Sequence, residues 1–345
     1  MRRHPLLAAA AAAGLLATAC GDGGTAGGGG AGTPVVAATT TVMGDVVAQL
    51  TGDLAEVVVI MPANADPHEF QPSAREAAAL RDADLVVANG GGFEEGLEDA
   101  LRSAEDDGAT VFEAVDHVAL LEPGEGGGSD DHADEESDDG DDHADEQGDG
   151  DDGDDHADDD GDDHGHDGAD PHVFTDPARM AAVAEALADV LADQVPALDT
   201  DAFRDRAAAY VDELRDLDAE VEGILAAVPA ERRKLVTNHD VFAYFADRYD
   251  FEVVGAVIPS TTTQAAASAA QIDDLARLVA SEGVPAVFAD TSSADDLAAT
   301  LAAEVGDVAV VELFSESLGA EGSGADTYAG MMRTNATRIA EALAP

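Results

Sequence analysis

The sequence predicts an α/β protein of two similar lobes, each built on a parallel sheet, joined by one long rigid helix. Short apolar runs alternate with alanine-rich stretches of helical spacing, which is the pattern of βα repeats. The alternation occurs twice, on either side of a charged helical stretch at 201–227 that has no Gly or Pro until Gly223. A chain of 345 residues is long enough for two such lobes, each with its own core.

In the first lobe, four apolar runs are expected to be buried strands: 35–38, 57–61, 85–88 and 111–115. Helical spacing follows at 73–81, 93–103 and 176–195, the last of which stops at Pro196. The second lobe is expected to have strands at 235–238, 252–258, 286–289 and 308–313. Its helices are expected at 241–249, 264–282, 294–304 and 327–343. Because the linking helix is long and unbroken, we expect it to limit the hinge motion of the lobes.

The predicted organisation has five parts: a signal peptide at 1–19, a flexible tether at 20–33, the first lobe at 34–196, the linking helix at 197–230 and the second lobe at 231–345.

The N-terminus, MRRHPLLAAAAAAGLLATAC, has the basic start, the short apolar stretch and the small residues of a secretory signal. Ala17 to Cys20 resembles a bacterial lipobox, and Cys20 is the only cysteine, so an intramolecular disulfide is impossible. We therefore expect Cys20 to carry a lipid anchor. The glycine-rich sequence after it would be the tether. The predicted location is extracytoplasmic, on the periplasmic or cell-surface face of the membrane.

The formal net charge of −58 excludes nucleic acid as a partner, because that function needs a basic surface, and it favours the attraction of cations. Residues 124–168 hold 23 Asp or Glu, five His and only three apolar side chains, all alanine. This composition predicts a disordered loop within the first lobe. DDHAD recurs in it, and we expect its histidines to bind several metal ions weakly: His132, His143, His156, His164 and His166. The alternative is a solvated acidic linker with no role in metal binding.

Three of the remaining histidines follow predicted strands or begin a helix. His68 lies in MPANADPHEFQP, His172 in DPHVFTDP and His239 in LVTNHDVFAYF. In parallel α/β sheets, ligands bind beyond the carboxyl ends of the strands, and imidazole is a common ligand of zinc and neighbouring metals. Each histidine alone could be an ordinary loop or capping residue, but together they predict a metal site between the lobes. His117, in AVDHVALLEP, has no comparable position and is expected to be structural or at the surface.

Several segments resemble a known family. GDVVAQLTGDLAEV, ADPHEFQPS, VVANGGGFE, DPHVFTDP, TNHDVFAYFADRY and ADTYAGMMRTNATRIAEAL are similar to segments of the cluster A-I solute-binding proteins, in the same order. These are the zinc- and manganese-binding lipoproteins of bacterial ABC importers, including the ZnuA-like group. The resemblance covers roughly residues 35–343, interrupted by the acidic stretch. It implies a binding protein that delivers a metal ion to a membrane ABC permease, and we expect it to act as a monomer.

The resemblance also implies a ligand set. It places the first three ligands at His68, His172 and His239, and a fourth, when it is a carboxylate, at Asp326 in GADTYAGMM. Asp326 could instead cap the helix that follows it. Three imidazoles and one carboxylate make a closed tetrahedral shell of the kind that suits zinc, whereas manganese prefers sites richer in oxygen. We therefore expect Zn(II) as the transported ion, with Mn(II) in the same role as the alternative.

Two functions of other classes remain open at this point. A zinc metallohydrolase would use the three histidines and a bound water, but the sequence has no HExxH and no GxSxG motif, and we expect no enzyme activity. A metal-dependent adhesin is the second alternative, because relatives have been labelled adhesins.

Overall fold

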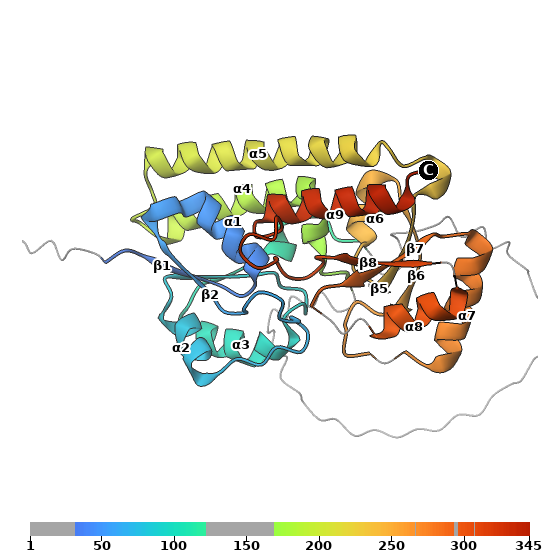
Figure 1. Cartoon of the computed structure of the whole chain (residues 1–345). Coiled ribbons are helices and arrows are strands. Elements are labelled where there is room, and N and C mark those ends of the chain that lie inside the picture. The colour runs from blue at the N-terminus through green and yellow to red at the C-terminus, as the bar shows by residue number, and fades with distance from the viewer. Residues whose placement is uncertain (1–31, 122–168, 266, 293–295, 307) are drawn as a thin grey trace, which may run out of the picture. The chain divides into compact units, whose positions relative to one another are not determined.

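Two four-stranded sheets form where the apolar runs were predicted, and every strand pairs parallel to its neighbours (Figure 1). The first sheet has the order β2-β1-β3-β4 and the second the order β6-β5-β7-β8. In both sheets the chain enters an inner strand, moves to one edge and then crosses to the other side. This common order confirms the predicted two-lobe α/β fold with βα repeats. The strands are β1 Val35–Ala38, β2 Glu56–Val59, β3 Leu85–Ala88, β4 Val111–Glu113, β5 Lys234–His239, β6 Glu252–Ile258, β7 Ala286–Asp290 and β8 Ala309–Leu313.

This computed structural model describes residues 32–121, 169–265, 267–292, 296–306 and 308–345. Residues 33–345 form one compact structural unit, which contains both lobes. The helices are α1 Thr41–Thr51, α2 Ala74–Asp82, α3 Glu98–Asp106, α4 Pro177–Gln194, α5 Asp201–Leu225, α6 Ala243–Tyr249, α7 Ala269–Glu282, α8 Asp296–Val305 and α9 Tyr328–Leu343.

The two faces of each sheet bury different side chains, as the two-residue period of a strand requires. In β1, Val36 and Ala38 belong to the largest core, whereas Ala37 belongs to a smaller core under α2 and α3. The second sheet repeats this pattern, with Val236 and Val287 in a separate small core beneath α7 and α8. The large core contains residues of both sheets and of α1, α4, α5 and α9, so one hydrophobic interior is continuous between the lobes.

Two helices connect the lobes. α5 packs against α1 and α4 of the first lobe and against α9 at the end of the chain (Figure 1). The C-terminal helix α9 also reaches the first lobe, because the backbone N–H of Tyr328 donates to Asp45 in α1 at 2.8 Å. The hydroxyl of Tyr328 donates to the backbone oxygen of Phe174 at 2.8 Å. The sequence predicted that one helix, α5, joins the lobes. The structure shows that α9 also contacts both lobes.

Three helices differ from the predicted elements by more than two residues. The helix predicted at 93–103 is α3, which begins only at Glu98 after the 3-10 helix Glu95–Leu97. α1 was not predicted as a separate helix; its Gly44 faces β2, where a Cβ atom would lie 2.5 Å from Cγ2 of Val59. The predicted helix 264–282 begins only at Ala269, where Ser268 and Gln271 form a capping box, so residues 260–265 are not helical.

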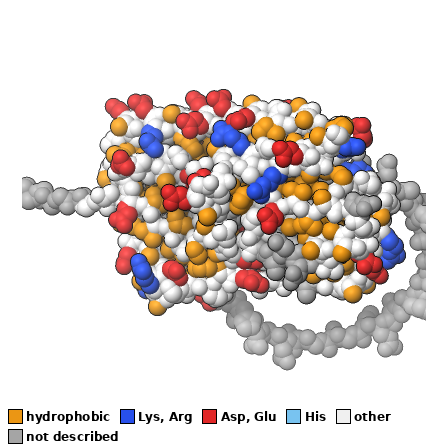
Figure 2. All heavy atoms as spheres, viewed as in Figure 1, with side chains coloured by type: hydrophobic (Ala, Val, Ile, Leu, Met, Phe, Trp, Pro, Cys, Tyr) orange, Lys and Arg blue, Asp and Glu red, His pale blue; other side chains and the backbone are white. Residues whose placement is uncertain are grey.

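On the face shown in Figure 2, the acidic side chains are not gathered into one patch. Figure 2 shows carboxylate side chains spread over one face, with arginine or lysine side chains and hydrophobic side chains between them. No helix within the described residues is long and apolar enough to cross a membrane.

The contact between α5 and α6 gives a first prediction. Asp218 of α5 is buried and accepts hydrogen bonds from Arg248, with Nε at 2.8 Å, and from the Tyr249 hydroxyl at 3.1 Å. Asp218→Ala should therefore lower the free energy of unfolding by about 2 kcal/mol, because hydrogen bonds to a charged group are lost. Urea denaturation measures the change. The matched control is Asp216→Ala, an exposed residue of the same helix, which should change stability by no more than about 0.5 kcal/mol. Equal losses in both variants would contradict the assigned role of Asp218.

Candidate metal centre

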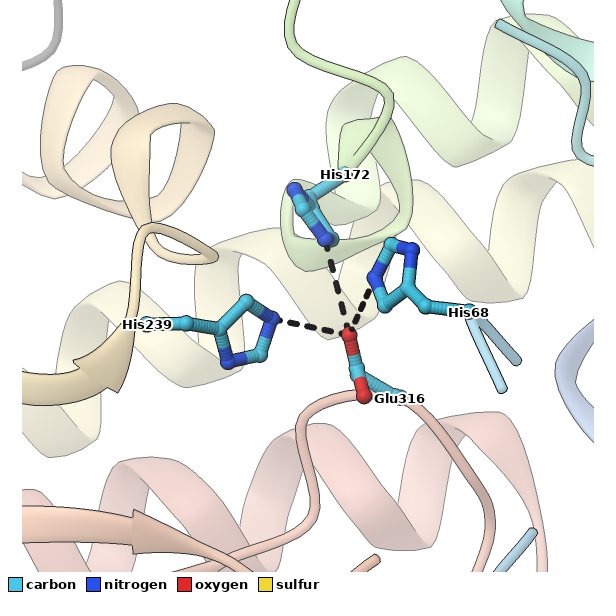
Figure 3. Close-up of side chains that lie close together, drawn as sticks. All are labelled: His68, His172, His239 and Glu316. Carbon is cyan, nitrogen blue, oxygen red and sulfur yellow. Dashed lines mark hydrogen bonds and ion pairs between the residues drawn. The ribbon is translucent and has the colours of Figure 1, made fainter. Parts of the chain in front are cut away.

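Four side chains converge from the carboxyl ends of strands in both lobes (Figure 3). His68 lies in the loop after β2, and His172 immediately precedes the short 3-10 helix Val173–Thr175. His239 is the last residue of β5, and Glu316 follows β8. The relative exposure of these four residues does not exceed 2 %. This position agrees with the rule that parallel sheets bind ligands where the loops of several strands meet.

One carboxylate oxygen is the centre of the group. Nε2 of His239 lies 2.8 Å from Oε1 of Glu316, and Nε2 of His68 lies 2.9 Å from the same oxygen. Nε2 of His172 lies 3.7 Å from it, beyond hydrogen-bonding distance. Among the described residues, this nitrogen has no hydrogen-bond partner, although it is buried and directed at the group.

The dimensions match those of a first-row metal ion. Ligand atoms about 2.1 Å from a tetrahedral zinc ion are about 3.4 Å apart, and the contacts to Glu316 lie on either side of this value. One ligand atom from each of the four residues lies within 4.8 Å of all the others. Small movements of the side chains would therefore admit an ion, which would also satisfy the unpaired Nε2 of His172.

The orientation of the His172 imidazole is fixed by a hydrogen bond on the side away from Glu316. Nδ1 of His172 donates to Oδ1 of Asp170 at 2.7 Å, and the same oxygen accepts from the His172 backbone N–H at 2.9 Å. A carboxylate behind a metal-binding imidazole fixes its tautomer and raises its basicity. Nδ1 of His68 faces Oε1 of Glu95 at 3.5 Å. The ring of Phe93 contacts both imidazoles edge-on, at centroid distances of 5.3 Å from His68 and 5.5 Å from His172.

The ionisation of the group follows from these contacts. Burial opposes the charge of Glu316, but the His239 charge, the hydrogen bonds with His239 and His68 and the nearby His172 ring outweigh it and hold the pKa of this carboxyl well below its usual range. Burial also opposes the charge of His172, but Asp170 and Glu316 outweigh it and raise the pKa of His172 to about 9. At neutral pH His172 is therefore protonated, and a metal ion that binds at Nε2 must displace this proton.

The loop that carries Glu316 is held by a second buried carboxylate. Asp290, at the end of β7, accepts from the Ser315 backbone N–H at 3.1 Å, from the Ser315 hydroxyl and from Ser292. The hydroxyl of Ser292 in turn lies 3.3 Å from Oε2 of Glu316. Burial, and next the charge of Glu316, raise the pKa of Asp290. Asp290 therefore positions the loop without joining the group of four.

The structure brings together three of the four predicted ligands and replaces the fourth. Asp326 is exposed and accepts a hydrogen bond from the Gly322 backbone N–H at 2.9 Å, away from the group. Its alternative role as a helix cap is taken by Thr327, whose side chain accepts from the Gly330 N–H. The His3Asp set expected from the sequence is therefore corrected to His3Glu.

Glu316 was missed although a signal for it existed. It lies three residues after β8 of the second sheet, so the rule about strand ends applies to it as it does to His239, at the end of β5, and to His68, in the loop after β2. Histidines are few in this sequence and stand out at strand ends, whereas a glutamate is one of many acidic residues, and the resemblance implies Asp326 for the fourth position.

Of the remaining predicted residues, the structure describes His117 but not the signal peptide, Cys20 or the histidines of the acidic stretch. His117 is exposed and stacks on Phe112 at a centroid distance of 4.4 Å, as expected for a surface residue. The signal peptide at 1–19, Cys20 and the histidines of the acidic stretch lie outside the described residues: His132, His143, His156, His164 and His166.

The fold and the group of four define a class, a two-lobe α/β protein with a cluster of potential metal ligands where its lobes meet. The family model described as "Zinc-uptake complex component A periplasmic" (ZnuA) matches residues 36–342, and the chain belongs to this family. The protein is thus a metal-binding, substrate-binding component of an ABC transporter. Its predicted extracytoplasmic location is confirmed, because the family is periplasmic and several relatives are named lipoproteins.

Individual relatives are named for two different metals. The chain is 26 % identical over 295 residues to the manganese-binding lipoprotein MntA of Halalkalibacterium halodurans, covering 85 % of this chain and 83 % of that one. It is 37 % identical over 180 residues to the zinc-binding protein TroA of Treponema pallidum, covering 51 % of this chain and 58 % of TroA. The solved structure of the periplasmic zinc-binding protein TroA superposes with a TM-score of 0.73 at 27 % identity, covering 91 % of this chain and all of that one.

The replacement of Asp326 by Glu316 gives a second prediction. Glu316→Ala should weaken metal binding by more than about 100-fold, because it removes the only carboxylate of the group, and His68→Ala should do the same. Asp326→Ala should change affinity by no more than about twofold. Competition with a fluorescent chelator measures all three variants. A loss in Asp326→Ala that matches the loss in Glu316→Ala would restore Asp326 to the site.

Proposed function

We propose that this protein captures Zn(II) outside the cytoplasmic membrane and delivers it to the permease of an ABC importer. His68, His172, His239 and Glu316 hold the ion. The observation that carries the proposal is the convergence of three buried imidazoles on one oxygen of Glu316. Three nitrogens and one oxygen form a four-coordinate shell of the kind that zinc takes in closed sites.

A binding role is favoured over an enzymatic one. A catalytic zinc keeps one position open for water and has three protein ligands, whereas this group offers four protein atoms. The nearby carboxylates are also engaged, since Asp170 accepts from His172 and Asp290 accepts from Ser315. Neither is left to act as a general base. We further propose that the protein works as a monomer anchored through Cys20, with the permease as its partner.

Mn(II) in the same role is the second candidate, and one contact favours it. Among the described residues, Oε2 of Glu316 makes a long contact of 3.3 Å with Ser292, so both oxygens could turn to the ion and raise its coordination number. Manganese prefers such oxygen-rich coordination, and MntA of Halalkalibacterium halodurans is named for it.

The third prediction separates these candidates by coordination as well as by affinity. Almost any site of this kind binds Zn(II) more tightly than Mn(II), so relative affinity alone does not decide which ion is carried. We expect X-ray absorption of the zinc-loaded protein to show four ligands at about 2.0–2.2 Å. We also expect Mn(II) to be lost on gel filtration. Retention of one Mn(II) per chain, with five or six ligands and both oxygens of Glu316 bound, would favour manganese transport.

The acidic stretch is proposed to collect metal ions near the site. The Tyr244 hydroxyl donates to the backbone oxygen of Asp170 at 2.6 Å and accepts from the Leu121 N–H at 3.1 Å. The two described ends of this part of the chain therefore meet beside Asp170, the partner of His172. Ions bound weakly between these ends would be held close to the tight site, which raises their local concentration.

The fourth prediction tests this role. Deletion of residues 124–168 should leave one tight site and abolish the weaker ones, because the four proposed ligands lie outside the deleted segment. Calorimetric titration with Zn(II) should show the number of bound ions falling to one. Substitution of all five histidines in the segment by Asn should have the same effect, whereas His117→Asn, a surface control, should not. Identical titrations of the deletion variant and the full chain would identify the segment as an inert linker.

A further inference from the structure

A short segment of the second lobe lies across the first-lobe loop that carries His68. This segment, residues 260–264, follows β6 and has the sequence Ser-Thr-Thr-Thr-Gln; we call it the strap. It contains no large apolar side chain, so hydrogen bonds rather than hydrophobic burial determine where it lies. Its own conformation is maintained by local bonds, such as that from the Gln264 backbone N–H to the Thr262 hydroxyl at 3.2 Å.

The strap holds the peptide groups on both sides of His68. The Thr263 hydroxyl donates to Oδ2 of Asp66 at 2.8 Å, and Oδ1 of Asp66 accepts from the His68 backbone N–H at 2.9 Å. Nε2 of Gln264 lies 2.6 Å from the His68 backbone oxygen and 2.7 Å from Oε2 of Glu95. Because Oε1 of Glu95 faces the His68 ring at 3.5 Å, the backbone and the imidazole are both connected to the strap.

The other end of the strap lies beside a second proposed ligand. The backbone oxygen of Ser260 accepts from the N–H of Asp240, the residue after His239, at 3.0 Å. The strap therefore connects the surroundings of His239 in the second lobe with those of His68 in the first. A separation of the lobes at this point would pull these two ligands apart.

A different contact joins the lobes on the buried side of the site. Ser317, next to Glu316, has only 3 % of its surface exposed and accepts from the Asn64 backbone N–H at 2.8 Å. The strap side is open by comparison, because Gln264 is exposed and the Glu95 side chain is 34 % exposed. Water competes for the exposed bond between Gln264 and Glu95, but not for the bond from the Tyr328 hydroxyl to the backbone oxygen of Phe174, which is buried and also joins the lobes, so the lobes are held less firmly at the strap.

We propose that the strap is the gate of the metal site, with Thr263 and Gln264 as positioning residues that control how fast the ion leaves. The inference rests on the proposed function, since it takes His68 to be a ligand. While the strap is bound to the first lobe, His68 is held against the ion. When the bonds of Thr263 and Gln264 break, the loop of His68 is free to move and the ion leaves between Glu95 and Gln264. Each bond is individually weak, so the gate opens without disturbing the core.

The test is the rate at which zinc leaves the full-length, zinc-loaded protein. Thr263→Val and Gln264→Ala should each release Zn(II) to an excess of chelator about tenfold faster in stopped-flow experiments, because each removes bonds to the His68 loop. Both variants should still bind one tight zinc ion, with an unchanged association rate. Thr263→Ser keeps the hydroxyl and should restore the slow release.

Two exposed residues far from the strap provide controls. Gln194→Ala and Thr337→Val each remove a side-chain bond made within one helix or its end, and both should release zinc at the original rate. A double variant of Thr263 and Gln264 with unchanged release would overturn the gate. So would a loss of affinity that arises entirely from slower association. Retention of tight zinc in His68→Ala would instead overturn the proposed function, so the two failures are distinguishable.

Discussion

The approach of three imidazoles to a single oxygen of Glu316 is the contact on which the rest of the molecule depends. Four ionisable side chains are brought together with almost no exposure to water, and such burial is costly unless the charges compensate each other. In the ion-free form the protonated His172 offsets the charge of Glu316. The unpaired Nε2 of His172 leaves the compensation incomplete, and a divalent cation would complete it. Each lobe contributes part of the group, so the ion also links the lobes.

Such a cluster persists only because the loops around it are held firmly, and each sheet supplies a buried carboxylate for this purpose. In the first lobe Glu94 accepts from the N–H groups of Asn89 at 2.7 Å and Gly90 at 3.0 Å. The amide of Asn89 donates to the backbone oxygen of Pro171 at 2.9 Å, immediately before His172. Asp290 has the equivalent role for the loop of Glu316. Burial raises the pKa of both carboxyls, an energetic cost that the hydrogen bonds offset.

Most of the fold could be predicted from the sequence because its strands are short and uniformly apolar. β1, β3 and β6 have the predicted bounds, and the remaining strands differ only at their ends. α1 escaped prediction because it lies between the first sheet and α5 and is mostly buried, so its sequence lacks the polar face that marks a surface helix. The start of α7 was placed too early because Gln264 and the alanines after it are good helix formers. The bonds of Gln264 to the other lobe depend on tertiary structure and leave no periodic signal.

The candidate site was predictable to the extent that its residues follow strand ends. His68, His172 and His239 could be selected because the topology of a parallel sheet determines where its carboxyl ends meet. The fourth residue could not be chosen by type, since the sequence has 74 Asp and Glu residues. The distinction between Glu316 and Asp326 depends on which loop turns inward. Here the hydrogen bonds of Asp290 to Ser315 determine that direction, and they join residues of two different strand ends.

The return of α9 to the first lobe has a consequence for how the chain acquires its structure. α1 is covered in part by a helix that is synthesised much later than α1 itself, and Tyr328 bonds to Asp45 across 283 positions. Contacts of such long sequence separation form late, because closing a large loop costs entropy before the contact is gained. The N-terminal lobe therefore lacks part of its cover until the whole polypeptide is present. In a partly exported chain the N-terminal lobe would remain incompletely folded, and an incompletely folded chain can pass through a secretion channel.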